Sequence, residues 1–521
     1  MIETTETMTT RDGVELVATA WRPAESGRFP VLLSRTAYGR GLSGPGFHLD
    51  VPRLVAAGYA VVAQDVRGTG DSDGELRFIS GEAADGYDAV RWAATRPWSD
   101  GNIGMYGDSY LAITQLLAAQ ERPEGLRAIA PHVSPAGLYE CVYQPGGIPN
   151  LNVLLTVGLI VLGPHELDRR IARGTATPRD KEAYLAEAVR FGELSDRLPL
   201  SDQPLLTDLV PFYAPWMDTP DPLDPLWREG IVDHAAIEVP ALVSTGWYDY
   251  FVDASIEHYE RLRGDSRLIV GPWSHFTHDR DICGRGYGDH ASQDAVDWTG
   301  THLDWFDQWL RGAAPRDRAR VKIFVMGDDE WREEADWPIR RARRVPYHLG
   351  RDGTLSTTPG TGGAAEFAGD PADPVPTVGG AVMMFDAFGP LDQRPLDERA
   401  DVLRHQSEPL AERVEVSGHV ELVARVSSTA PATDLTAKLI DVHPSGRAEL
   451  LTDGIVRVTG LVPGEVREVT VPLGAISNAF LPGHRIRIDV AGSNFPRFGR
   501  NPEKGTTTLH APSYAVLPTI S

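Results

Sequence analysis

Between Pro30 and Pro131 short apolar segments alternate with helical ones, and this alternation limits the fold more than any other feature of the chain. A parallel pair of strands needs a long crossover connection, which a helix usually supplies. The alternation therefore predicts an α/β fold, whose parallel sheet is covered by helices on both faces. The expected strands are 31–34, 59–64, 103–106 and 126–131, and the expected helices are 82–96 and 110–120.

The alternation stops near Tyr143 and resumes about a hundred residues later. Residues 144–238 are mostly helical and Pro-rich. A helical block that interrupts a strand–helix series is most simply an inserted cap. We therefore expect core residues 1–143 and 239–345 on either side of a cap at 144–238. The resumed pattern predicts strands 241–245, 268–271 and 321–326 and helix 254–262.

The last part of the chain has a different character. Segments 359–363 and 370–380 are rich in Gly and Pro, and β-type runs follow them at 414–426, 436–442 and 486–490. Short strands that recur with turns between them are typical of β-sandwiches and jelly rolls. We expect residues 346–521 to form a C-terminal jelly-roll domain.

The charge of the chain disfavours one class of partner. Acidic residues outnumber basic ones by 73 to 50, which gives a formal net charge of −23. Binding to a phosphate backbone requires a basic surface. We therefore expect a small-molecule substrate and no nucleic-acid partner. The oligomeric state is left open, a homodimer included.

Cys141 and Cys283 are the only cysteines, too few for a disulfide framework or a cysteine-based zinc site. The histidines show no metal-ligand spacing, so we expect neither a metal nor a cofactor. Met1–Thr5 lacks the start of a signal peptide. The longest apolar run, Val153–Leu162, is too short to span a bilayer and predicts a buried helix. These features favour a cytoplasmic protein without membrane contact.

The strongest chemical signal is Gly107-Asp108-Ser109-Tyr110-Leu111, where an expected strand meets an expected helix. A serine at such a turn projects its hydroxyl above the sheet edge, as a nucleophile must. The N–H of Tyr110 then lies at a helix start and can donate to an oxyanion. Leu111 stands where the motif has a second glycine, and Ala112 is the nearest small residue.

A serine hydroxyl needs a base, and on this fold an acid and a histidine follow it, each just after a strand. Asp249 follows strand 241–245 and His275 follows strand 268–271. We predict that His275 is the base and that Asp249 orients it. Asp253 is the rival acid, although it stands where a helix N-cap is wanted. His278 is the rival base, one helical turn further on.

The second oxyanion donor is expected in the loop after an early strand, here 34–39. Tyr38 could offer its hydroxyl there. From its position alone, a buried core tyrosine explains Tyr38 equally well.

At this point the sequence resembles the bacterial cocaine esterase group of serine hydrolases, whose relatives include X-prolyl dipeptidyl peptidases, α-amino-acid ester hydrolases and glutaryl-cephalosporin acylases. The resemblance implies an α/β-hydrolase core, a helical cap and a C-terminal jelly roll. It also implies that the hydroxyl of Tyr38 joins the N–H of Tyr110 in an oxyanion hole. The matching motifs are Arg35-Thr36-Ala37-Tyr38, Gln64-Asp65-Val66-Arg67-Gly68, the segment 100–110, Gly246-Trp247-Tyr248-Asp249, Gly271-Pro272-Trp273-Ser274-His275 and Ser493-Asn494-Phe495-Pro496-Arg497.

The substrate pocket is harder to place. The cap resembles the family least, because the family's early cap segments carry tryptophans and residues 138–163 hold none. In this segment Tyr143 is the candidate substrate contact. An apolar cluster after the linker 370–380 supplies Met384, Phe385 and Phe388. In the family this domain packs beside the catalytic cleft, so these side chains could line an acyl pocket. Interdomain packing is the alternative.

Three activities fit these residues. The leading interpretation is hydrolysis of a small carboxylic ester through an acyl-enzyme on Ser109. Hydrolysis of an amide or peptide, as in the X-prolyl peptidases, is the second, and Glu140 and Asp218 are cap carboxylates that could hold a substrate amino group. Acyl transfer from the same acyl-enzyme is the third. A non-catalytic binding protein fits poorly with the presence of all the catalytic residue types.

Overall fold

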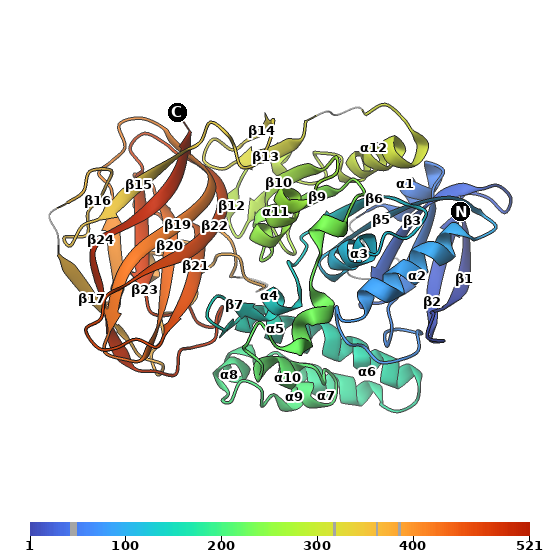
Figure 1. Cartoon of the computed structure of the whole chain (residues 1–521), viewed down its shortest axis with the longest axis horizontal. Coiled ribbons are helices and arrows are strands. Elements are labelled where there is room, and N and C mark those ends of the chain that lie inside the picture. Colours follow the sequence, from blue (N-terminus) through green and yellow to red (C-terminus); the bar gives the residue numbers. More distant parts are fainter. Residues whose placement is uncertain (42–48, 316–318, 361–362, 384–386, 521) are drawn as a thin grey trace.

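The computed structural model describes residues 1–41, 49–315, 319–360, 363–383 and 387–520. Figure 1 shows an α/β part built from residues before Glu334, a group of helices below it, and a β part built from the C-terminal residues. The chain forms the first part of the α/β region, then the helical group, then the rest of the α/β region, and last the β part.

The central sheet of the α/β part has ten strands among the described residues, in the order β1-β2-β4-β3-β5-β6-β9-β10-β13-β14. Strands β4, β3, β5, β6, β9, β10 and β13 are parallel, and β1, β2 and β14 pair antiparallel at the two edges. The strands are β1 (Ile2–Thr9), β2 (Glu15–Arg22), β3 (Phe29–Thr36), β4 (Ala60–Asp65), β5 (Ser99–Asp108), β6 (Leu126–His132), β9 (Leu242–Tyr248), β10 (Arg267–Ser274), β13 (Val321–Val325) and β14 (Glu330–Glu334).

Helices cover both faces of this sheet, and successive strand residues face opposite ways. On β3, Val31 and Leu33 belong to the apolar cluster under α2, α3 and α11, whereas Leu32 belongs to the one under α1 and α12. Double coverage explains the continuous apolar runs of the parallel strands. The helices are α1 (Val51–Ala56), α2 (Glu82–Ala94), α3 (Tyr110–Gln120), α11 (Val252–Arg261) and α12 (Trp298–Arg311). The predicted α/β-hydrolase-type core is confirmed.

Between β6 and β9 the chain forms the helical layer that lies below the sheet in Figure 1. Its longest helix runs continuously from Leu151 to Ala172 and contains one π-helical segment, Val157–Leu162. The helices are α4 (Leu138–Val142), α5 (Leu151–Thr156), α6 (Gly163–Ala172), α7 (Pro178–Ala188), α8 (Phe191–Asp196), α9 (Pro204–Thr207) and α10 (Tyr213–Met217).

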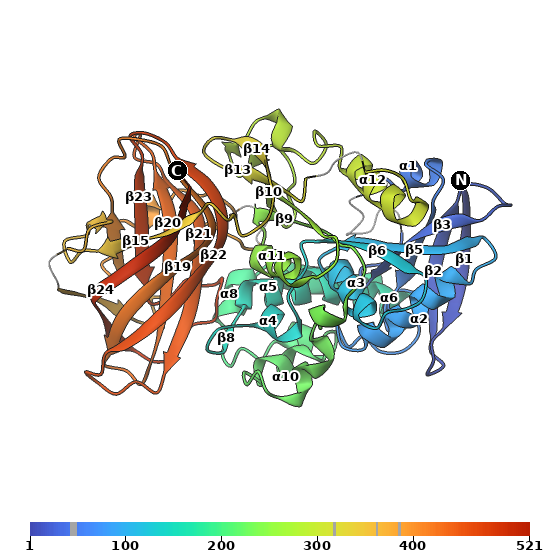
Figure 2. The ribbon, with the colours of Figure 1, turned by 45° about the horizontal axis from the view of Figure 1, so that its top comes forward.

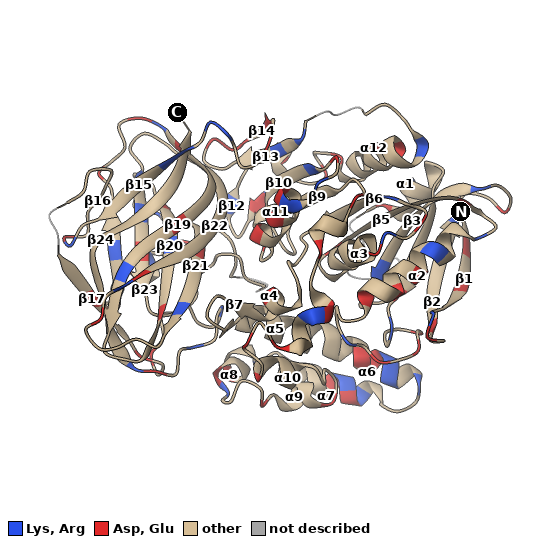
Figure 3. Cartoon of the chain, viewed as in Figure 1, with Lys and Arg blue, Asp and Glu red and all other residues tan. Residues whose placement is uncertain are grey.

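By length and composition the helix Leu151–Ala172 could cross a membrane, but 61% of its most apolar stretch is buried inside the protein. It is therefore the core helix of this layer, as the apolar run Val153–Leu162 predicts. Figure 3 shows charged residues on α6 and α7, whereas the sequence of α5 contains none. We call the helical residues between β6 and β9 the cap.

The C-terminal region consists of two antiparallel sheets, seen from another side in Figure 2. One contains β16-β15-β24-β19-β22, with β17 also paired to β24, and the other contains β18-β23-β20-β21. The first strand, β15, begins at Arg343, three residues before the expected boundary at 346. The strands are β15 (Arg343–Leu349), β16 (Leu355–Ser356), β17 (Ala364–Gly369), β18 (Val402–Gln406), β19 (Val414–Ser428), β20 (Ala432–Val442), β21 (Ala448–Thr459), β22 (Arg467–Phe480), β23 (Arg485–Ala491) and β24 (Gly505–Ile520).

This β domain packs against both other parts. Ile148 of the cap forms an apolar cluster with Ile455 and Phe498. On the core side, Arg332 of β14 makes hydrogen bonds of 2.8 and 2.5 Å with the carboxylate of Glu415 on β19. The β domain therefore has an interface with the cap and another with the core.

Candidate active site

Ser109 lies at the sharp turn between β5 and α3. Its φ of 57° is in the left-handed region that a non-glycine residue rarely adopts, which marks a strained position. The backbone N–H of Ser109 donates to the carbonyl of His132, 2.9 Å away. A Cβ on Gly107 would lie 2.5 Å from that of Leu111, so glycine is required at this strand–helix contact. Gly107 thus allows Leu111 to stand where the motif has a second glycine.

His275 and Asp249 stand at the ends of two neighbouring parallel strands, β10 and β9. The Nε2 atom of His275 lies 3.2 Å from Oγ of Ser109, and its Nδ1 atom lies 2.7 Å from Oδ2 of Asp249. The N–H of Phe251 donates to the other oxygen of Asp249 at 2.6 Å. Both side chains are buried. The structure therefore brings the three predicted residues together in the order serine, histidine, aspartate.

The two rival residues point elsewhere. Asp253 accepts a 2.7 Å hydrogen bond from the N–H of Ala475 on β22. Phe251, not Asp253, is the N-cap of α11, so the interpretation of Asp253 as a cap was wrong. His278 faces His132, with 3.4 Å between their Nε2 atoms.

Tyr38 and Tyr110 adjoin Ser109 from two different elements. Burial raises the pKa of Tyr38, and the nearby Ser109 side chain and Tyr110 backbone only partly oppose this. The phenol therefore stays protonated and can donate a hydrogen bond. The hydroxyl of Tyr38 and the N–H of Tyr110 both adjoin the nucleophile, as an oxyanion hole requires.

An apolar pocket opens beside Ser109, under the cap. The space between its walls, with the open mouth included, is about 580 Å³. None of the described residues that line it is Asp, Glu, Lys or Arg. Around Ser109, Tyr38 and Tyr110, the lining consists of Phe78, Ile79, Pro135, Cys141, Val153, Leu154, Val157, Gly158, Leu162, Val210, Phe212, Tyr213, Trp216, Phe251 and Met383.

Of the four predicted pocket residues, the structure describes two, Tyr143 and Phe388. Tyr143 is buried behind the pocket, where its hydroxyl donates to the carbonyl of Trp216 at 2.8 Å. Phe388 is buried in the main apolar core and is not part of the lining. Met384 and Phe385 lie outside the described residues. Substrate contacts of these four residues stay predictions.

Met383 is the first residue of the predicted apolar cluster but was not among the candidate pocket residues, and it lines the pocket. Its N–H donates to the side chain of Asn152 at 2.8 Å, and its carbonyl accepts from Thr156 at 3.1 Å. These bonds fix the segment before residue 384 to α5 of the cap. No local signal distinguishes Met383 from its neighbours, because the contact joins residues more than 200 positions apart.

The cap carboxylates Glu140 and Asp218 are exposed and do not line the pocket. Among the described residues, Asp441, His443 and His484 of the β domain could offer metal-ligand atoms within 4.8 Å of one another. His484 is already hydrogen-bonded to Asp441 at 2.8 Å, and none of the three lines the pocket.

The chain matches two family models along most of its length. Residues 12–277 match the X-Pro dipeptidyl-peptidase (S15) family, and residues 314–518 match the C-terminal non-catalytic domain of X-Pro dipeptidyl-peptidases. The chain is 39% identical to cocaine esterase of Rhodococcus sp. over 528 residues, which cover 95% of this chain and 91% of that protein.

Solved structures support the same fold. An aminopeptidase from a marine sediment thaumarchaeote superposes with a TM-score of 0.81 at 23% identity, covering 100% of this chain and 96% of the other. An α-amino-acid ester hydrolase superposes with a TM-score of 0.79 at 24% identity, covering 99% and 96%. A CocE/NonD family hydrolase from Staphylococcus aureus gives 0.73 at 20% identity, covering 99% and 93%. The chain therefore belongs to the X-Pro dipeptidyl-peptidase (S15) family and is a serine ester hydrolase.

Proposed function

We propose that this hydrolase cleaves small carboxylic esters with an uncharged, apolar acyl group, through an acyl-enzyme on Ser109. One observation carries the proposal: the Ser109 hydroxyl, 3.2 Å from Nε2 of His275, opens onto a pocket whose described lining has no formal charge. An apolar acyl group gains free energy by entering such a pocket, whereas a charged one would lose hydration without a partner.

In the proposed mechanism, His275 removes the proton of Ser109 as its oxygen attacks the ester carbonyl. The tetrahedral oxyanion accepts hydrogen bonds from the hydroxyl of Tyr38 and the N–H of Tyr110. The C–O bond to the alcohol then breaks, and His275 returns the proton to the leaving oxygen. Water repeats the attack on the acyl-enzyme and regenerates Ser109. Asp249 holds the histidine tautomer and stabilises the imidazolium.

The pocket favours this activity over peptide hydrolysis at a free amino terminus. An ammonium group needs a carboxylate partner when it is buried. The two carboxylates that the sequence suggests, Glu140 and Asp218, are exposed and lie outside the pocket lining. Acyl transfer would use the same acyl-enzyme with an alcohol or amine in place of water, and product analysis with an added acceptor distinguishes it from hydrolysis.

Ser109→Ala tests the proposal. We expect kcat on apolar acyl esters to fall by roughly 10⁴ or more, with an unchanged melting temperature. A fluorophosphonate should label the native protein, and peptide mass spectrometry should locate the adduct on Ser109. Unreduced hydrolysis by Ser109→Ala, or an adduct on another serine, would refute the assignment. Comparing benzoyl and butyryl esters with aminoacyl-nitroanilides tests the substrate class.

We further propose that the protein works in the cytoplasm without a nucleic-acid partner. Cys141 and Cys283 are both free thiols, as a reducing compartment allows. Fractionation of the producing cells tests this location.

A further inference from the structure

The side chain of Tyr110 is buried, and its hydroxyl meets a buried carboxylate. Its hydroxyl donates to Oε1 of Glu82 at 2.8 Å. Its ring packs on Phe78, with 4.9 Å between the centroids. Both Tyr110 and Glu82 are buried. The residue that offers its backbone N–H beside Ser109 is therefore anchored at the far end of its own side chain.

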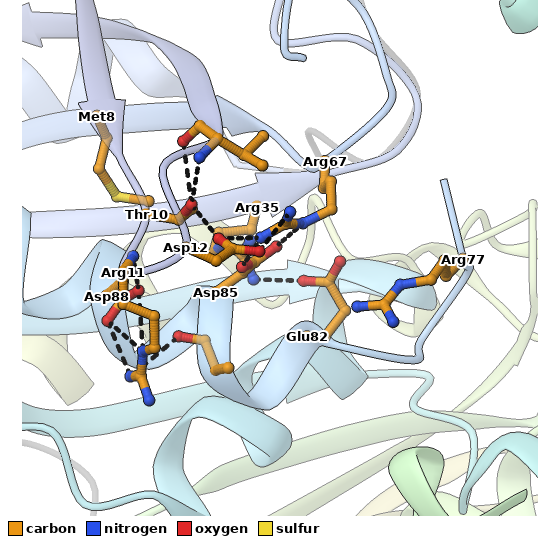
Figure 4. A network of polar contacts seen from close by, with 12 residues as sticks. Met8, Thr10, Arg11, Asp12, Arg35, Arg67, Arg77, Glu82, Asp85 and Asp88 are labelled. Carbon is orange, nitrogen blue, oxygen red and sulfur yellow. Dashed lines mark hydrogen bonds and ion pairs between the residues drawn. The ribbon is translucent and has the colours of Figure 1, made fainter. Parts of the chain in front are cut away.

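Glu82 is the first residue of α2, and its other oxygen, Oε2, is paired with the guanidinium of Arg35. Arg35 lies on β3 with a fully buried side chain, and its Nε donates to Gln64 at 2.9 Å. Figure 4 shows this pair of Arg35 and Glu82 between the sheet and α2. Because the two opposite charges are in contact, the buried carboxylate adds little net negative charge near the oxyanion.

Arg35 also stands three residues before Tyr38, at the end of the strand that leads to it. Glu82 thus contacts both the residue that carries the oxyanion N–H and the strand that leads to the oxyanion hydroxyl. We propose that Glu82 is a positioning residue for the oxyanion hole: through Tyr110 and Arg35 it holds both donors in place.

The physical need for such an anchor lies in the turn itself. Ser109 has a strained backbone, so the peptide that carries the Tyr110 N–H keeps its direction only if neighbouring contacts fix it. Oxyanion donors act through their fixed orientation, and a small misplacement weakens the transition state more than the ground state. A charge-assisted hydrogen bond to a buried carboxylate is stronger than a neutral one and suits this task.

Helix α2 offers a matched control one turn further on. Asp85 is also buried and accepts from Arg67, at 2.7 and 2.9 Å. The pair lies beside that of Glu82 in Figure 4, but both carboxylate oxygens of Asp85 accept from Arg67 and not from Tyr110. Asp85→Asn therefore perturbs the same helix and a similar ion pair without touching the oxyanion hole.

The experiment compares Glu82→Gln and Tyr110→Phe with Asp85→Asn. The measurements are kcat and KM on one apolar ester, the melting temperature, and the affinity of a trifluoromethyl ketone, whose serine adduct carries an oxyanion. For Glu82→Gln and Tyr110→Phe we expect kcat and ketone affinity to fall together, roughly 10- to 100-fold, with KM changed less than about 2-fold. Asp85→Asn should lower the melting temperature and leave kcat within about 2-fold.

If Glu82 acts through Tyr110, the fall in kcat of the double variant Glu82→Gln/Tyr110→Phe should be smaller than the product of the two single falls. If Glu82→Gln fails to fold, Tyr110→Phe is sufficient to test the proposal, because it removes one hydroxyl and keeps the ion pair of Arg35 and Glu82. Normal kcat and ketone affinity in the folded variants would overturn the proposal, as would equal losses in Asp85→Asn. The inference rests on the proposed function, but Ser109→Ala tests that separately: an inactive Ser109→Ala with a fully active Tyr110→Phe rejects only the role of Glu82.

Discussion

The catalytic edge of the core sheet and the cap wall face each other across the pocket, and they are built by different forces. At the sheet edge each functional group is held by a hydrogen bond, from Oγ of Ser109 through His275 to Asp249 and the N–H of Phe251. The cap wall presents Val157, Leu162, Phe212 and other apolar side chains without charged neighbours in the described lining.

This contrast separates two properties of the enzyme. Hydrogen bonds have direction and act on the charge that develops during reaction, so the sheet edge should control kcat for every substrate alike. Apolar contacts have no direction and grow with buried area, so the cap wall should control which acyl group is preferred. Variants at the sheet edge should therefore lower kcat for all esters, whereas variants of the cap wall should change the preference among acyl groups.

The largest effect is expected from Asp249→Asn. Its amide can no longer hold the required tautomer of His275, so kcat should fall by up to about 10⁴ for short and bulky esters alike. Steady-state kinetics on two acyl lengths measures this. Asp253→Asn is the control, since Asp253 binds the β domain at Ala475 and should keep a near-normal rate. The reverse result would mean that Asp253 is the acid.

Tyr38→Phe should have the next largest effect. It removes one oxyanion donor and keeps the aromatic ring, which lies 6.0 Å from that of Tyr110. We expect kcat to fall roughly 10²–10³-fold, equivalent to about 2.7–4 kcal/mol, with a smaller change in KM. A change in KM alone would mean that Tyr38 shapes the pocket and does not stabilise the oxyanion.

The same contrast explains what could be predicted from sequence. Ser109, Asp249 and His275 each follow a buried strand, and the parallel order of strands brings such ends to one edge. Local sequence therefore predicts their meeting. Strand β14 was missed because Glu330–Glu334 is a charged edge strand without apolar alternation.

Nonlocal contacts limit the prediction elsewhere. Asp253 is placed by Ala475, 222 residues away, and not by its own helix. For the cap, the apolar run 153–162 predicts a buried helix, but the side that faces the substrate depends on how that helix packs. The π-helical turn changes which residues of this helix face the substrate, and no sequence pattern predicts such a turn.

On the cap wall, Phe212→Ala should change selectivity. Phe212 lines the pocket and packs on Trp216, with 4.5 Å between the centroids. The loss of this contact should lower kcat/KM for bulky relative to short acyl esters by about 1–3 kcal/mol, or roughly 5- to 150-fold. Phe388→Ala is the matched control: its ring is buried outside the described lining. It should lower the melting temperature and scale all esters alike. Altered selectivity in Phe388→Ala would instead support the predicted acyl contact.

The smallest effect on stability and selectivity is expected from a single hydrogen bond to the cap wall. The Tyr184 hydroxyl donates to the carbonyl of Leu159 at 3.0 Å, inside the π-helical segment that lines the pocket. A π-helical turn leaves its carbonyls less well paired, so this bond stabilises the turn. Tyr184→Phe should cost about 1 kcal/mol of unfolding free energy, measured by urea denaturation.

The same variant tests whether that bond also shapes the pocket. The Cβ of alanine at Gly163 would lie 2.1 Å from the Tyr184 oxygen, so Gly163→Ala should displace the same hydroxyl from the other side. Both variants should shift the preference between short and bulky esters in the same direction, by roughly 2- to 5-fold. They should leave kcat for the short ester unchanged, because neither touches the hydrogen-bonded edge. A fall in kcat for every ester would show that the π-helical turn supports catalysis as well as selectivity, and the separation between the two regions would fail.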